Sequence, residues 1–273
     1  MPLRRAHYLV LAMVLATVVA FWPTYFAVLR TARTELHFHG VTATAWMLLL
    51  ALQSWTIHHQ RRGAHRIFGI VSLFLFPLFL AGSVAVLLSM ARSTPSDTFY
   101  QINGGRLGIL DAATPILLMV LFYFALKERR KVQLHARYML ATALPLVEPI
   151  IERLLGHLIP PFTAFDPAQF AWTMRAAEVG GLVAAACLYA TAPRYGRPFF
   201  IVGMAMVAQA VLVETLGESS VWQTVFVGLG KLHSLPVLAV ATIVGGLTVW
   251  AGWTAGLAAR GTSLQRPEGR SAA

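Results

Sequence analysis

Two of the nine histidines occupy matching positions beside clusters of basic residues. His65 lies in segment 58–66 (HHQRRGAHR) and His135 in segment 129–137 (RRKVQLHAR). Each segment joins two long apolar runs, and each histidine is followed within two residues by an arginine. Neutral imidazoles on different helices of a bundle bind haem iron or other metal ions. The sequence therefore predicts haem or metal binding by this pair, with anchoring at the membrane surface as the alternative.

A second candidate metal site lies elsewhere in the chain. His37 and His39 form an H-x-H element in segment 35–40 (ELHFHG), and His233 precedes the last apolar run. Two imidazoles in H-x-H share one side of an extended strand, whereas on a helix they diverge by about 200°. We expect His37, His39 and His233 to contribute to a divalent metal site, and His39 to serve as a further cofactor ligand.

Several ionisable residues fall inside or at the ends of apolar runs, where burying a charge in a bilayer costs about 2.5 to 3.5 kcal/mol. We expect helices carrying Glu148 or Glu152 to meet Arg175, either as a structural network or around a polar cavity. The prolines of segment 145–149 (PLVEP) leave backbone carbonyls without helical donors and favour the cavity. The predicted lining is Asp111, Glu148, Glu152, Arg175, Glu178 and Glu214.

This cavity is compatible with three functions. A glutamate with a raised pKa beside a histidine relays protons in a transporter. Alternatively, carboxylates and histidines bind a divalent metal in a membrane metallohydrolase, although no paired histidine motif is present. In the third, Arg175 binds an anionic substrate during transport. The sequence contains no phosphate-binding loop, dinucleotide motif or nucleophile elbow, and the single cysteine, Cys187, excludes a disulfide within the chain.

These residues must be positioned by membrane-spanning helices. Of the chain, 57% is hydrophobic and 12% is charged, and the mean hydropathy is +0.65, far from the values of soluble domains. The apolar runs are continuous and predict an all-α, polytopic transmembrane helical bundle with about eight spans. The seventh run is short, so seven spans remain the alternative. The spans lie near 8–29, 40–58, 67–90, 107–126, 137–157, 169–191, 198–214 and 234–259.

The basic residues predict the orientation of the bundle. Most of the 22 Lys and Arg residues fall on the side that holds the N-terminus, loops 58–66 and 127–137, and the C-terminal tail. The positive-inside rule then predicts that both termini are cytoplasmic. We expect one domain over 1–259 and a disordered cytoplasmic tail over 260–273. The net charge of +11 is dispersed over short loops, which favours contact with anionic lipid headgroups and argues against nucleic-acid binding.

The pattern of His39, Gly40, Trp46, Gln53, His65-Arg66 and Gly69 resembles that of a group of uncharacterised bacterial multi-pass membrane proteins. His135 with Met139 is similar to a later His-x-x-x-Met element of that group. More distantly, the histidines resemble those of membrane proteins that assist maturation of haem-copper oxidases. The resemblance covers about half of the chain. It implies a bacterial inner-membrane protein, with a role in respiratory assembly or electron transfer and with respiratory complexes as partners.

Overall fold

The chain is a bundle of helices. The computed structural model describes residues 3–159 and 167–264, and all regular secondary structure in these ranges is helical. The α-helices are α1 (Ala6–Ala20), α2 (Thr34–His58), α3 (Arg62–Ser93), α4 (Thr98–Lys127), α5 (Val132–Ala141), α6 (Val147–Leu158), α7 (Pro167–Thr191), α8 (Arg197–Leu216), α9 (Ser220–Leu229) and α10 (Ser234–Leu264). Short 3-10 turns are η1 (Phe26–Val28), η2 (Leu144–Leu146) and η4 (Pro193–Tyr195).

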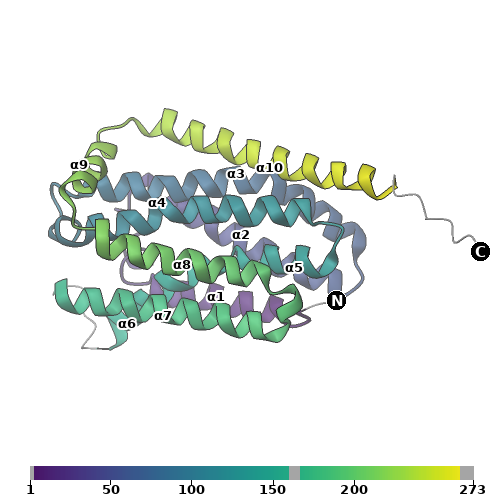
Figure 1. Cartoon of the computed structure of the whole chain (residues 1–273). Coiled ribbons are helices and arrows are strands. Elements are labelled where there is room, and N and C mark those ends of the chain that lie inside the picture. The colour runs from purple at the N-terminus through teal and green to yellow at the C-terminus, as the bar shows by residue number, and fades with distance from the viewer. Residues whose placement is uncertain (1–2, 160–166, 265–273) are drawn as a thin grey trace, which may run out of the picture.

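Most of the helices run lengthwise beside one another (Figure 1). α4 packs against α3, α5, α8 and α10, and α2 packs between α1 and α3. α7 lies between α6 and α8, while α10 runs along α3 and α4 on the outside of the bundle (Figure 1). By length and composition, α2, α3, α4, α8 and residues 234–258 of α10 are five helices long and apolar enough to cross a membrane. The all-helical architecture is confirmed, and these apolar helices indicate a multi-pass membrane protein.

The predicted fifth span, 137–157, is not one continuous helix. α5 ends at Ala141, η2 covers Leu144–Leu146, and α6 begins at Val147. Pro145 has no amide hydrogen to donate to the preceding turn, and its ring would clash with the carbonyl group of residue 141. The chain therefore leaves the α-helix and starts a new one within the same predicted span.

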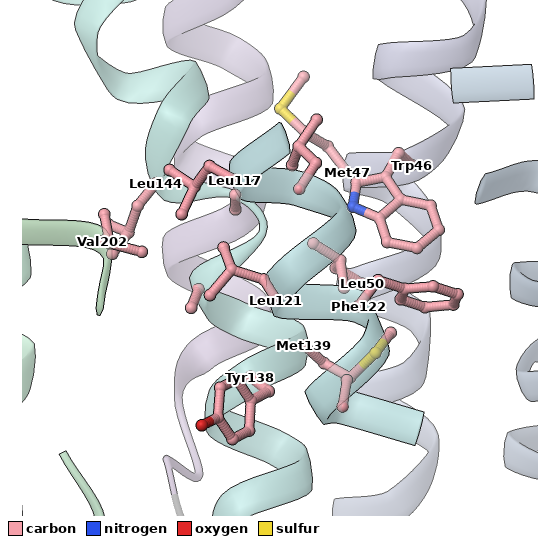
Figure 2. Packing of buried hydrophobic residues seen from close by; sticks show 14 of the residues in the cluster. Trp46, Met47, Leu50, Leu117, Leu121, Phe122, Tyr138, Met139, Leu144 and Val202 are labelled. Carbon is pink, nitrogen blue, oxygen red and sulfur yellow. The ribbon is translucent and has the colours of Figure 1, made fainter. Parts of the chain in front are cut away.

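The hydrophobic core joins α2, α3, α4 and α5. Figure 2 shows part of this cluster, with Trp46 and Leu50 of α2 on the same side as Phe122 of α4. The fully buried ring of Trp46 has its centroid 5.7, 5.5 and 5.4 Å from those of Phe76, Phe79 and Phe122. Because these large rings interlock in the middle of the bundle, they fix how α2, α3 and α4 lie relative to one another.

Five histidines lie at one end of this bundle, which we call the histidine end. α1 begins there, α2 and α4 end there, and α3 and α5 begin there (Figure 1). The residues are His7, His58, His59, His65 and His135. α10 also finishes at this end, and it continues to Leu264, beyond the predicted start of the tail at residue 260. Residues 265–273 lie outside the described part of the chain.

Candidate functional site

His65 and His135 make the same kind of hydrogen bond at the histidine end. The Nδ1 atom of His65 is 3.3 Å from the carbonyl oxygen of Gln53, near the end of α2. The Nδ1 atom of His135 is 2.8 Å from the carbonyl oxygen of Ala125, near the end of α4. A carbonyl oxygen only accepts, so Nδ1 must donate in both rings and Nε2 keeps its lone pair.

These two bonds have equivalent places in two helical hairpins. In α2–α3 and in α4–α5, a histidine of the second helix is tied to the last turns of the first helix. Both rings are half-buried, and His65 and His135 are within electrostatic range of each other. The structure thus brings the sequence-predicted pair to the same end of the bundle, with both imidazoles oriented as ligating histidines usually are.

His39 does not belong to this pair. It lies 14 residues before Gln53 on the same continuous helix, which corresponds to about 21 Å along the axis at 1.5 Å per residue. Its Nδ1 atom is buried without a hydrogen-bond partner. The predicted cofactor set of His39, His65 and His135 is therefore not assembled around one centre.

The predicted metal site at the opposite end is not brought together either. α2 begins at Thr34, so the H-x-H element is helical and its imidazoles diverge. His37 is bonded through Nδ1 to the Tyr25 hydroxyl at 2.8 Å, and His233 is exposed before α10. Within 3–159 and 167–264, no group of three or more His, Cys, Asp or Glu side chains is placed to hold a metal ion. A metallohydrolase needs at least three such side chains within coordination distance of one ion, and these residues do not provide them.

The predicted acidic cavity is divided into two clusters. In the first, Arg153 of α6 binds the Glu152 carboxylate at 3.1 Å and the Pro149 carbonyl at 3.2 Å. The charge of Arg153 also acts on Asp111 of α4 and His39 of α2. This cluster joins three helices that are far apart in sequence, and Arg153 is its central cation.

The second cluster surrounds α7. Glu178 is within electrostatic range of Glu148 and Glu214. Glu148 lies against Gly181, where a Cβ would come within 3.1 Å of the Glu148 Cγ. Arg175 pairs with Glu214 of α8 at 2.9 Å. The expectation that Arg175 meets Glu148 or Glu152 is therefore wrong, because α7 lies between α6 and α8 and presents Arg175 toward α8.

A lateral groove of about 550 Å³ runs between the end of α1 and α6. Its wall is almost entirely apolar, with Arg153 and His157 as the polar contributors; the lining residues are Val18, Val19, Ala20, Trp22, Pro23, Arg153, Leu154, His157 and Leu158. The groove borders the first cluster but not the histidine pair. It lies between the end of α1 and α6, away from the histidine end.

Sequence reasoning missed one member of the histidine end. The ring of His7 lies 6.5 Å, centroid to centroid, from those of both His58 and His59. No spacing motif marks His7, because its neighbours come from a helix that ends about fifty residues later in the chain. Only the pairing of α1 with α2 reveals this cluster.

With this geometry in place, the chain was compared with known proteins. No protein family, curated protein or solved structure matches it.

Proposed function

We propose that this chain is a multi-pass membrane protein that binds a redox-active centre, a haem iron or another metal ion, through His65 and His135. The observation that carries the proposal is the pair of equivalent Nδ1 bonds to the Gln53 and Ala125 carbonyls. Metal-ligating histidines commonly donate their other ring nitrogen to a carbonyl or carboxylate, which fixes the ring and its tautomer. The two rings are thus prepared to ligate through Nε2.

The protein's contribution would be to orient the ligands and to exclude water. Phe68 and Leu134 lie three residues after His65 and one before His135, and both pack against the main core. A haem iron bound there would supply one-electron transfer, with a potential that depends on its axial ligands and surroundings. Electron transfer or respiratory-complex assembly in the inner membrane of a bacterium is the role we propose for it.

The test is an absorption spectrum of the oxidised and dithionite-reduced protein, purified in mild detergent from a host supplied with haem precursors, together with elemental analysis. We expect a Soret band that sharpens on reduction, or a stoichiometric metal ion. The band or ion should be lost in His65→Ala and in His135→Ala. His233→Ala removes an exposed histidine at the opposite end and should leave the signal unchanged. A featureless spectrum with no bound metal would overturn the proposal.

We further propose that the bundle has eight spans with both termini in the cytoplasm. The arginines of loops 58–66 and 129–137 support this, because both loops lie at the histidine end, where α1 begins. Anionic headgroups of the inner leaflet would contact these arginines. Single cysteines in these loops, in a Cys187→Ser background, should resist an impermeant thiol reagent in intact cells and react after lysis. Labelling of these cysteines in intact cells would show that the loops face the outside and that the orientation is the opposite one.

A second candidate, a proton-coupled transporter, is favoured by the break between α5 and α6. Discontinuous membrane helices commonly form the binding sites of transporters. Here the break places Glu148 in the first turn of α6, within electrostatic range of Glu178. Reconstituted protein should then show proton flux that is lost in Glu148→Gln but kept in Glu218→Gln, which alters an exposed acid. Equal flux in protein-free vesicles would remove this candidate.

A further inference from the structure

Three polar atoms are buried without a hydrogen-bond partner where the start of α1 meets the end of α2. They are Nδ1 of His7, Nε2 of His58 and Oγ of Ser54. His7 as a whole is only 6% exposed. Buried polar atoms nearly always have a partner, and an orphaned group commonly marks an ion or a water molecule. A gathering of three such atoms at one helix contact therefore indicates a bound species.

The two imidazoles present suitable donor atoms. Nδ1 of His58 is 2.7 Å from the carbonyl oxygen of Ser54, so Nδ1 carries the proton and Nε2 the lone pair. The orphaned Nδ1 of His7 likewise supplies a lone pair when its proton is on Nε2. The site therefore offers two neutral nitrogen ligands from two helices, and imidazole ligands suit copper, zinc, iron and nickel.

The distance between the rings suits an ion held between two ligands. The centroids of His7 and His58 are 6.5 Å apart. Two imidazoles on opposite sides of one ion have centroids about 6 Å apart, since each metal–nitrogen bond is about 2 Å and each ring adds about 1 Å. Tetrahedral coordination would bring the rings closer together and would need more ligands. The described residues hold no group of three or more His, Cys, Asp or Glu in metal-binding geometry.

The positive charges near the site favour a monovalent over a divalent ion among those that imidazole binds. Arg4 and Arg5 precede His7, and Arg61 and Arg62 follow His58 by a few residues, with no Asp or Glu in either stretch. Repulsion from these guanidinium groups is twice as large for a divalent as for a monovalent cation. Cu(I) is monovalent, is bound by imidazole, and accepts linear coordination by two ligands.

We propose that His7 and His58 form a two-coordinate Cu(I) site at the histidine end. The site uses neither His65 nor His135 and goes beyond the function proposed above. His59 is not a ligand: its ring is also 6.5 Å from that of His7, but its side chain is exposed and carries no buried nitrogen without a partner. The bound ion would satisfy both orphaned nitrogens and hold α1 against α2.

The test is an anaerobic titration of the full chain in detergent with Cu(I), in competition with a chromophoric Cu(I) chelator. We expect each chain to retain one Cu(I) in competition with the chelator. The affinity for Cu(I) should fall at least tenfold in His7→Gln and in His58→Gln. His59→Gln is the matched control and should bind as the unaltered protein does. X-ray absorption of the loaded protein should show two nitrogen neighbours and no sulfur.

Further variants separate this site from the proposed redox centre. His65→Ala and His135→Ala should retain the Cu(I) affinity, whereas the absorption band expected at that centre should survive His7→Gln. If His7→Gln fails to fold, as judged by its elution and melting temperature, the milder His58→Asn provides the measurement. The proposal would be overturned if the protein does not compete with the chelator for Cu(I), or if the folded variants bind Cu(I) with unchanged affinity. Preference for Zn²⁺ over Cu(I) would also overturn it. A buried water molecule between the two rings would then be the explanation of the orphaned nitrogens.

Discussion

The indole nitrogen of Trp46 donates a hydrogen bond to the Thr142 hydroxyl oxygen, 3.0 Å away. Trp46 is in the middle of α2 and Thr142 directly follows the end of α5, at the break in the fifth predicted span. The Thr142 hydroxyl in turn donates to the Met139 carbonyl at 2.6 Å. The broken segment is thus attached to the fully buried ring of Trp46.

Trp46→Phe should destabilise the bundle modestly. The phenyl ring preserves most of the packing but removes the indole donor, and a lost hydrogen bond costs about 1 kcal/mol. Thermal unfolding in detergent measures the change. Trp55→Phe, which alters a ring that is 38% exposed, should have a smaller effect. Equal melting temperatures for the two variants would show that the Trp46–Thr142 bond contributes nothing.

Gly245 and Gly246 should respond in opposite ways to alanine. A Cβ on Gly245 would come within 2.7 Å of the Pro77 Cα, whereas a Cβ on Gly246 meets nothing within 4 Å. Gly245→Ala must therefore push α10 away from α3 and lower the melting temperature. Gly246→Ala should be neutral or stabilising by up to about 1 kcal/mol, the difference in helix propensity. A stabilised Gly245→Ala would contradict the close contact.

Arg92 should hold the start of α10 in place. Its guanidinium group contacts the Glu35 carboxylate, the Ser234 hydroxyl at 2.6 Å and the Gly230 carbonyl at 3.2 Å. Arg92→Gln should cost about 1.5 to 3 kcal/mol, because these are hydrogen bonds to a charged group. Hydrogen–deuterium exchange should accelerate over residues 220–240.

Arg175→Gln provides the comparison for Arg92. The Arg175–Glu214 pair is about half exposed, at 44% and 49%, so its loss should cost under about 1 kcal/mol. Exchange over residues 220–240 should remain as in the unaltered protein. Acceleration of the same size in both variants would indicate general loosening and not a local role of Arg92.

Arg153 and Asp111 should be coupled in a double-mutant cycle. Arg153→Gln leaves Asp111 and Glu152 without their nearby cation, and we expect a loss of about 1 to 3 kcal/mol. Adding Asp111→Asn should recover part of that loss, because one carboxylate no longer needs neutralisation. The melting temperatures of the two single variants and of the double variant measure how strongly the stability effects of the two substitutions depend on each other. Strict additivity would show that the two side chains act independently.

The fold class could be predicted from the sequence because continuous apolar runs determine helices directly. The predicted spans 67–90 and 107–126 lie within α3 and α4. The boundaries were harder to predict: α2 begins six residues before the predicted 40, since Glu35, His37 and His39 are polar yet helical. α9 (Ser220–Leu229) was not predicted, because ten residues are too few to resemble a span.

The partners of the ionisable residues could not be predicted in the same way. That Glu148 and Glu152 share a face of one helix follows from their spacing, but which helix lies opposite depends on packing. Arg175 consequently pairs with Glu214 and not with Glu148 or Glu152. Two similar loops marked His65 and His135, which lie at the same end of the bundle, whereas nothing in the sequence links His7 to His58.

The position of α10 has a consequence for how the protein is made. Its contacts are with Pro77 of α3 and Tyr123 of α4, which leave the ribosome long before residue 234. Membrane helices first insert and then associate, so the surface formed by α3 and α4 must face lipid until α10 has been made. Docking of α10 then covers that surface, and a nascent chain arrested before residue 234 would present it to insertion chaperones and quality-control proteases.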